Sequence, residues 1–410
     1  MENPKIRFKG FTKDWEQRKL IDYLEVSSEK NRDNRFTKDD VLSVSGEYGI
    51  VNQIEFQGRS FAGASVSNYG VVENGDVVYT KSPLKSNPYG IIKTNKGIPG
   101  IVSTLYAVYK PKEITDSKFV QIYFELDSRM NSYMHPLVNK GAKNDMKVSA
   151  ENALKGMVSF PKKDEQEMIS LYFSNLDHLI TLHQRKCEQT KNLKKYMLQK
   201  MFPQNGAKVP EIRFKGFTKD WEQRKLGDDL VSIHTGTNLL GSITNTGMPL
   251  IKMGNIQRGY FDTSKVEFLA ENEQPDKADI VNYGDFFFNT RNTLELVGKG
   301  ATWMKNSGEY AFNSNIARFE LRNLDTIFFN YLYNTDYMTK QIHARAMGTT
   351  SVAAIYPRTL DSVEYLAPCM KEQQKIGAYF KQLDHLITLH QRKCDELKKM
   401  KKFMLQNMFI

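Results

Sequence analysis

Two long stretches of the chain place apolar or small residues at alternating spacings of four and three. The first stretch carries this seam at Ile169, Phe173, Leu176, Ile180, His183, Cys187 and Thr190. The second carries it at Ile376, Phe380, Leu383, Ile387, His390, Cys394 and Leu397. Such a repeat is typical of an α-helix that packs one stripe against a partner helix in a coiled coil. The pattern therefore predicts two long helices, over residues 161–203 and 368–410.

Residues at the ends of the two stretches support these helix limits. Pro161 and Pro368 stand where proline is favoured, at the start of a helix. Asp164 and Glu165 follow the first proline, at the end of a helix that favours negative charge. Pro203 closes the first stretch, because proline cannot continue a helix.

Two strings each occur twice in the chain, letter for letter. LDHLITLHQRKC runs from Leu176 to Cys187 and again from Leu383 to Cys394, and IRFKGFTKDWEQRKL runs from Ile6 to Leu20 and again from Ile212 to Leu226. The offsets, 207 and 206 residues, are about half of the 410 residues, which indicates a tandem duplication. Residues 1–20 and 211–226 are called the frame pieces below.

Two segments between the repeated strings, residues 21–155 and 227–365, do not match each other in sequence. Their strand-like runs are Gly70–Thr80, Ile101–Tyr109 and Gly284–Asn289, and their helix-like runs are Ser117–Met134 and Thr326–Met347. Asn74-Gly75 is a dipeptide that favours a hairpin-type turn. The mixture predicts an α+β fold with one globule in each half of the chain.

These elements predict four parts in chain order. They are a globular domain over residues 1–160, a helix over 161–203, a second globular domain over 204–367 and a second helix over 368–410. The first helix leaves one globule for the other, and the second must return along it, so we expect the helices to run antiparallel. The expected molecule is a pseudo-two-fold tandem repeat with a coiled-coil bar of roughly 60 Å.

The composition indicates folded cores and favours a polyanionic partner. Hydrophobic residues make up 40% of the chain and aromatic residues 11%, which is too many for a disordered protein. The net charge of +11 favours nucleic acid as a partner. A basic soluble protein without such a partner has the same balance, so the charge alone leaves both interpretations open.

The cysteines and the apolar runs bear on the compartment. Cys187, Cys369 and Cys394 form no disulfide or metal-ligand framework, and two of them share one repeated seam position, which is typical of core residues in a reducing cytosol. The N-terminus lacks the apolar core of a signal peptide, and no run of 18 apolar residues occurs. We therefore expect a cytoplasmic protein without a membrane segment.

The sequence shows no motif for catalysis or cofactor binding. It has neither the GxxxxGK[ST] phosphate loop nor the GxGxxG dinucleotide loop. His178 and His183 stand five apart, which is poor spacing for two ligands of one metal, and no HExxH occurs. Asn87-Pro88-Tyr89 resembles the Asn-Pro-Pro-Tyr loop of adenine methyltransferases but lacks one proline. We expect no catalytic residue, no metal and no cofactor bound by this chain.

Turns rich in hydrogen-bond donors follow a Gly-Asp strand in both variable segments, and further polar clusters precede both long helices. Lys, Arg, Asn, Ser and Thr are the side chains that contact DNA phosphates and base edges. The candidates for DNA contact are Lys81, Ser82, Lys85, Asn87, Lys140, Lys143, Asn144, Arg258, Thr290, Arg291, Asn292, Thr349 and Ser351. Ordinary solvated loops have the same composition. Two unlike globules on one frame predict a DNA site with two unlike halves, whereas a homodimer reads a palindrome.

In the order of its elements the sequence resembles the specificity (S) subunits of type I restriction–modification enzymes. The resemblance covers the whole chain and rests on ordered motifs. The first half has Trp15 and Leu20, a GDVVYTKSP-like strand, Gly141, Pro161, Asp164-Glu165-Gln166 and Leu176-Asp177. The second half has Gly284-Asp285, Gly348, Pro368, Glu372-Gln373 and Leu383-Asp384.

This resemblance implies a non-catalytic subunit whose two target-recognition domains, residues 1–160 and 204–367, each bind one part of a split double-stranded DNA site. It implies two methyltransferase (M) subunits docked on the helices and frame pieces, and two restriction and motor (R) subunits in the complete complex. S-adenosylmethionine, ATP and Mg are then expected on those partner subunits. The candidates for docking are Trp15, Arg18, Trp221, Arg224, His183, Arg185, His390 and Arg392.

Two other functions stay open from the sequence. One is a stand-alone DNA-binding regulator or architectural protein, and the other is an enzyme whose site leaves no motif. The identical repeats have two possible explanations. One is docking of two identical partners, and the other is recent gene duplication.

Overall fold

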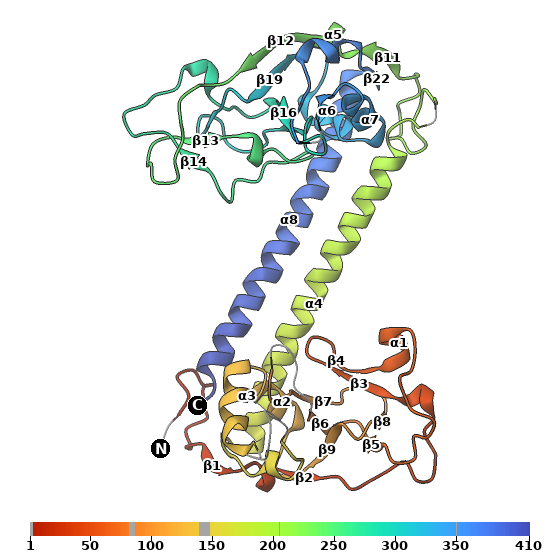
Figure 1. The fold of residues 1–410 in the computed structure, drawn as a ribbon, viewed down its shortest axis with the longest axis vertical. Helices are drawn as coiled ribbons and strands as arrows, with labels where there is room; N and C mark the ends of the chain where they lie inside the picture. The colour runs from red at the N-terminus through yellow and green to blue at the C-terminus, as the bar shows by residue number, and fades with distance from the viewer. Residues whose placement is uncertain (1–2, 82–86, 139–147, 205, 350) are drawn as a thin grey trace. The chain divides into compact units, whose positions relative to one another are not determined.

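The computed structural model describes residues 3–81, 87–138, 148–204, 206–349 and 351–410, and Figure 1 shows their fold as a ribbon. The chain divides into two compact units. The first unit comprises Met1–His183 together with Arg392–Ile410, and the second comprises Gln184–Gln391. Strands and helices occur in both units, so the chain has the mixed α+β class that the sequence predicts.

Two helices of 38 residues each lie within the ranges that the seam predicts. They are α4 (Lys163–Lys200) and α8 (Met370–Asn407). Each unit contains one part of α4 and one part of α8, because the boundaries of the units fall inside both helices.

In the first unit, the buried side of α4 packs against the last turns of α8. Ile169, Phe173, Leu176 and Ile180 of α4 share a hydrophobic core with Cys394, Leu397 and Leu405 of α8 and with Met408, which follows the helix. Lys401 Nζ lies 2.7 Å from Asp177 Oδ1, and the ring of Phe173 lies 6.0 Å from that of Phe409. Asp177 thus lies beside Lys401, and the earlier residue Phe173 lies beside the later residue Phe409. The two helices therefore run in opposite directions here.

The second unit repeats this packing with the helices exchanged. Cys187 Sγ lies 3.8 Å from the carbonyl oxygen of Ile387, and Lys194 Nζ lies 2.5 Å from Asp384 Oδ1. Asp177 and Asp384 are the same position of the repeated string, and Lys194 and Lys401 are also equivalent. Each unit therefore holds its two helix segments together by a lysine–aspartate pair at the same repeat position.

The frame pieces add one short strand to each unit. The strand β1 (Glu16–Lys19) pairs antiparallel with β10 (Met157–Phe160), and β11 (Glu222–Lys225) pairs antiparallel with β22 (Glu364–Ala367). Both partner strands lie directly before a long helix. The pairing therefore fixes each frame piece at the start of the helix that follows its own globule.

A buried ion pair strengthens that attachment. Arg7 Nε and Nη2 each lie 2.7 Å from an oxygen of Glu165, whose side chain is 2% exposed. In the second unit, Arg213 contacts Glu372 in the same bidentate way at 2.6 and 2.7 Å. Both carboxylates lie in the first turn of a long helix, where the helix dipole also favours negative charge.

A buried glutamine next to each of these carboxylates connects the helix to the globule. Gln166 accepts a 2.9 Å hydrogen bond from the backbone of Asp116 and donates one of 2.9 Å to the carbonyl of Pro161. Gln373 bonds Asp325 and Pro368 in the same way, at 2.9 Å each. Asp116 and Asp325 cap the helices that follow them, α2 (Ser117–Tyr123) and α6 (Thr326–Tyr333).

Each of the two variable segments forms its own four-stranded antiparallel sheet, and the two sheets have the same strand order. In the first unit the strand order is β2 (Leu24–Val26), β9 (Tyr106–Pro111), β6 (Val77–Thr80) and β7 (Ile92–Thr94). In the second it is β12 (Leu230–Thr235), β19 (Ile316–Leu321), β15 (Phe286–Asn289) and β17 (Gly300–Thr302). Their sequences do not match, but strand order and direction agree.

One helix packs on the last strand of each sheet through the same polar contacts. Thr94 N and Thr302 N donate to the side chains of Gln121 and Asn330, each at 2.9 Å. The Oγ1 atoms of these threonines donate at 2.6 Å to the carbonyls of Ser117 and Thr326, which begin α2 (Ser117–Tyr123) and α6 (Thr326–Tyr333). A shared scaffold therefore lies under the unlike sequences.

Smaller sheets and helices complete the two globules (Figure 1). In the first unit they are β3 (Leu42–Ser45) with β4 (Gly49–Asn52), β5 (Gly70–Val72) with β8 (Gly100–Val102), and α1 (Gln53–Gln57). In the second they are β14 (Glu267–Phe268), β13 (Pro249–Ile251) and β18 (Ala311–Phe312) in that order, β16 (Arg291–Asn292), β21 (Ala353–Ala354) and β20 (Met347–Gly348) in that order, and α5 (Leu226–Asp229).

Two local predictions are wrong. Ser117–Met134 and Thr326–Met347 each divide into two helices, α2 and α3 (Asp127–Met134) in the first unit and α6 and α7 (Asp336–His343) in the second. The second break occurs because Thr335 is extended and its hydroxyl caps α7.

The turn at Asn74-Gly75 is present, with Gly75 at a φ of 90°. It joins β5 and β6, which belong to different sheets, so it is not the turn of a hairpin.

Replacing Arg7 with Met should lower the free energy of unfolding of the first unit by about 3 kcal/mol, because the Glu165 carboxylate is left buried without its partner. The double variant Arg7→Met, Glu165→Met should recover most of this loss. Urea denaturation measures both.

Arg392→Met is the matched control, because the Arg392–Glu396 pair is 79% and 49% exposed. It should change stability by no more than about 0.5 kcal/mol. An Arg7→Met protein as stable as the wild type would contradict the proposed importance of the buried pair.

Candidate nucleic-acid interface

In the second unit, a short sheet brings two of the predicted DNA-contact turns together. Arg291 pairs with Ala354 and Asn292 pairs with Ala353, and the same two alanines pair on their other side with Met347 and Gly348. The central strand β21 therefore places residues 290–292 beside residues 347–349. These turns are far apart in the sequence, and their proximity is a product of the fold.

The side chains of the first turn have different surroundings. Arg291 is exposed, and Asn292 is partly exposed. Asn292 Oδ1 accepts a 2.8 Å bond from the backbone N–H of Thr293. Thr290 donates to the carbonyl of Asn315 at 3.1 Å, and its own carbonyl accepts a 3.0 Å bond from Ile355 N–H. Thr290 therefore stabilises the turn, while Arg291 presents its guanidinium to the solvent.

The second turn depends on Gly348. Its φ is 127°, and a Cβ atom at this position would lie 2.4 Å from the carbonyl oxygen of Val352. The backbone N–H of Thr349 donates to that same carbonyl at 2.9 Å. The hydroxyls of Thr349 and Ser351 lie 3.2 Å apart and are both on exposed residues.

Arg258 lies on a nearby turn and contacts a residue that the sequence did not indicate. Its Nη2 atom is 3.0 Å from Nε2 of His343, the last residue of α7. Partial burial and the neighbouring charge of Arg258 lower the pKa of His343 below its usual value. The ring is therefore neutral at pH 7, and its Nε2 accepts the bond from Arg258.

Lys299 is a second basic residue at this place that the sequence reasoning missed. Its Nζ atom donates to Gln257 Oε1 at 2.8 Å, and burial and Arg258 lower the pKa of the ammonium group. The lysine stands between Gly298 and Gly300, a pattern that could have drawn attention to it. His343 carried no such signal, because its role depends on where α7 ends.

The first unit tests fewer of the predicted contacts. Lys81 is partly exposed, and burial, followed by the charge of Lys30, lowers the pKa of its ammonium group. Asn87 is only 7% exposed, so the prediction that its side chain reads DNA is corrected: in this structure it faces the interior. The candidates Ser82, Lys85, Lys140, Lys143 and Asn144 lie outside the described residues.

The predicted docking residues divide by exposure. Trp15 and Trp221 are 5% and 2% exposed, because each anchors its frame piece in the core of its unit. Direct contact of these two rings with a partner is therefore corrected to a supporting role. The residues with exposed side chains are Arg18, Arg185 and Arg392, whereas Arg224, His183 and His390 are partly exposed.

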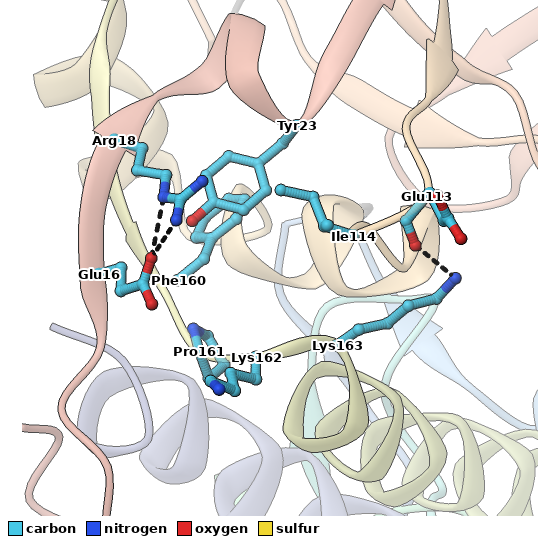
Figure 2. A pocket seen from close by; sticks show the side chains of 9 residues that line it. All are labelled: Glu16, Arg18, Tyr23, Glu113, Ile114, Phe160, Pro161, Lys162 and Lys163. Carbon is cyan, nitrogen blue, oxygen red and sulfur yellow. Dashed lines mark hydrogen bonds and ion pairs between the residues drawn. The ribbon is translucent and has the colours of Figure 1, made fainter.

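A cavity of about 460 Å³ in the first unit lies beside Arg18 (Figure 2). Its other lining residues are Glu16, Tyr23, Glu113, Ile114, Phe160, Pro161, Lys162 and Lys163. Arg18 donates to Glu16 at 2.9 Å, and Lys163 donates to the carbonyl of Glu113 at 2.8 Å. Burial raises the pKa of Tyr23 to about 12, so its hydroxyl stays protonated at neutral pH. The lining offers charged and aromatic contacts but no His, Cys or Ser side chain.

The equivalent arginine of the second unit is held differently. Arg224 donates to Glu222 at 2.7 Å and to the carbonyl of Asn323 at 3.2 Å, and it lies 3.6 Å from Asp229. Identical frame sequences thus place their arginines in different surroundings, because the variable segments supply different neighbours.

Neither a metal site nor a membrane helix is found among the residues with described positions. No three His, Cys, Asp or Glu side chains of that set lie close enough together to hold a metal ion. No helix of that set has a stretch long and apolar enough to cross a membrane.

The second half of the chain matches a known family. Residues 218–399 match the model of the type I restriction modification DNA specificity domain. Over 339 residues the chain is 23% identical to the type I restriction enzyme MjaVIII specificity subunit of Methanocaldococcus jannaschii, which covers 77% of this chain and 74% of that protein. The family resemblance stated from the sequence motifs is confirmed.

A solved structure supports the fold. The S subunit of a type I restriction–modification system from M. genitalium has a TM-score of 0.60 with this chain at 12% identity, and the match covers 100% of this chain and 99% of that one. At this identity the likeness concerns the fold.

Replacing Arg258 with Ala should raise the pKa of His343, because it removes the nearest positive charge. In the wild type the lowered pKa means that the unfolded chain binds a proton first as the pH falls below about 6.5. His343 therefore reduces stability at acid pH and has no effect above that range. Titration of the histidine Cε1–H signals by NMR, with His343→Gln for assignment, measures the pKa; a wild-type value above 6.5, or no change in the variant, would contradict this geometry.

Proposed function

Because the chain is a specificity subunit of the type I restriction–modification kind, with its specificity domain at residues 218–399, we propose that each unit reads one half of an asymmetric, bipartite DNA site. The chain itself is non-catalytic. The observation that carries the proposal is one strand order under two unlike sequences. A common scaffold with different loops suits two related readers of different bases.

The chemistry of the second unit supports a reading role. Arginine can bond O6 and N7 of guanine with two donors, and asparagine can bond adenine in a similar way. Arg291 and Asn292 stand side by side on β16, and the exposed hydroxyls of Thr349 and Ser351 lie on the neighbouring turn. In the first unit, Lys81 and the candidates outside the described residues take the equivalent role in this proposal.

Exposed apolar residues at equivalent positions support docking of two identical partners. Within the first unit, Met400 and Phe403 of α8 are 47% and 54% exposed. Within the second, Leu193 and Tyr196 of α4, which occupy the same repeat positions, are 44% and 50% exposed. Large apolar side chains next to each other on a helix favour a protein partner. We assign these positions to two methyltransferase subunits.

The remaining activities of the system belong to partner subunits in this proposal. The methyltransferase subunits bind S-adenosylmethionine, and two restriction and motor subunits add ATP- and Mg-dependent cleavage. The two 38-residue helices, each about 57 Å long at 1.5 Å per residue, set the spacer between the half-sites. Coiled-coil packing and a pseudo-two-fold arrangement of the repeats are the geometry that this role needs.

Replacing residues 21–155 by the variable segment of a related chain should change one half-site and leave the other half-site and the spacer as they were. The matched replacement of residues 227–365 should change the other half only. Sequencing of methylated sites in cells that carry the hybrid and the methyltransferase subunit measures both. A hybrid that changes both halves at once would refute independent reading by the two units.

Leu193→Glu with Tyr196→Glu should reduce the methyltransferase subunits that co-purify with the chain from two to one, because charges replace one apolar contact. Met400→Glu with Phe403→Glu should do the same at the other position. Gln199→Glu and Gln406→Glu, at exposed equivalent sites of the same helices, are the controls. Size-exclusion chromatography with light scattering gives the stoichiometry. A wild-type chain that binds its DNA site tightly and takes up no methyltransferase would favour the stand-alone regulator.

A further inference from the structure

We infer that Arg258 and Lys299 of the second unit together hold a backbone phosphate of the bound DNA, and that His343 and Gln257 position them. The inference rests on the proposed DNA-reading function and deepens it. It assigns a phosphate contact, independent of base sequence, to a cluster beside the turn that carries Arg291.

The arginine of this cluster is oriented before any ligand binds. Arg258 is an exposed residue, and its Nη2 donates to Nε2 of His343 at 3.0 Å. Because arginine can only donate, this bond requires a neutral ring with its proton on Nδ1. A guanidinium is planar, so one fixed N–H bond restricts the direction of the other donors.

The lysine is placed by a second pair of contacts. Lys299 Nζ donates to Gln257 Oε1 at 2.8 Å, and Gln257 Nε2 donates to the carbonyl of Gly254 at 2.9 Å. The glutamine therefore fixes the ammonium group on the same turn that carries Arg258. An ammonium is a point charge without base preference, which suits a phosphate oxygen.

The turn itself is fastened to the sheet and to a helix. Gly259 N–H donates to the carbonyl of Gly300 at 3.0 Å, and Asn330 Nδ2 donates to the carbonyl of Gly259 at 3.1 Å. Gly300 begins β17, and Asn330 lies in α6. The turn that carries Arg258 is therefore anchored to a strand and a helix, which reduces the ordering that binding requires.

The two cations of the cluster have neutral hydrogen-bond partners. In the part of the chain that the structure describes, Arg258 contacts the neutral ring of His343, Lys299 contacts the side-chain amide of Gln257, and Glu295 acts on Lys299 from a distance. The charge of Arg258 acts on Lys299 and helps to lower the pKa of its ammonium group, and two such neighbouring cations favour an anion between them. A phosphate supplies that charge together with several acceptor oxygens.

The position of the cluster fits a duplex that also touches Arg291. Asn289 N–H donates to the carbonyl of Lys299 at 2.8 Å, and Gly298 N–H donates back to Asn289 at 3.0 Å. Asn289 is two residues before Arg291, and His343 is followed within a few residues by β20. Asn289 therefore connects the segment of Lys299 directly to the segment that carries Arg291.

The test uses the full chain and two fluorescent duplexes, one with its methylated site and one unrelated, with fluorescence anisotropy over a series of KCl concentrations. Arg258→Ala and Lys299→Ala should each reduce the slope of log affinity against log salt by about 1. Both variants should reduce the affinity for the two duplexes by the same factor. His343→Phe should act like Arg258→Ala, and His343→Gln should restore the wild-type slope, because its amide oxygen can accept the same bond.

Lys277→Ala is the matched control. Lys277 precedes Asp279, whose carboxylate is 2.8 Å from His234 of β12, at the opposite edge of the sheet from β17. Its slope should equal that of the wild type, and thermal melting shows that all variants are folded. An unchanged slope in the variants, or a loss of affinity confined to the duplex with the methylated site, would overturn the phosphate contact. The reading function would still stand if the wild type prefers that duplex. A wild type that binds both duplexes equally would refute the reading function itself.

Discussion

Each long helix begins against a buried arginine–carboxylate pair, and the order of the whole unit depends on it. The pairs Arg7–Glu165 and Arg213–Glu372 join residues 158 and 159 positions apart. Removing two charges from water is costly, and bidentate geometry with further hydrogen bonds is what makes such a pair tolerable. The pair fixes the relative positions of the frame piece, the strand before the helix and the first helical turn. The adjacent Gln166 and Gln373 extend this junction to the globule.

The two variable segments have different sequences but form sheets with the same strand order. The central strand of the sheet reads VVYT in the first unit and FFFN in the second, yet its neighbours are the same in order and direction. A threonine on the adjacent strand bonds a helix amide in both units, with Gln121 in one and Asn330 in the other. Equivalent hydrogen-bonding positions thus persist where side-chain volume does not. The loops above such a scaffold are free to differ, which is the requirement for two readers of unlike sequences.

The sequence predicts the long helices well, because a seam of seven-residue period leaves little choice of structure. It also predicts the α+β class and the duplication, which is visible letter for letter. It does not predict that the two unlike segments form sheets with the same strand order, since strand order depends on long-range pairing that local patterns do not encode. The split of each predicted helix into two is likewise invisible in the apolar spacing, because a single extended residue such as Thr335 decides it.

The candidate site shows the same division. Arg291 and Ser351 could be proposed from composition, but β21 is what brings their two segments together. Arg258 depends on His343 at the end of α7, and its turn is fastened by the bond from Gly259 N–H to Gly300 of β17. The chemistry of Asn87 and the two tryptophans suits contact with DNA or a partner, but all three side chains are buried.

The central claim is that two units with one scaffold read two different halves of one DNA site. Long-read sequencing of adenine methylation, in cells that carry the wild-type chain and a methyltransferase subunit, tests it most directly. The account predicts one methylated motif with two different short half-sites separated by a spacer of fixed length and arbitrary sequence. A palindrome, or a single continuous motif, would contradict it.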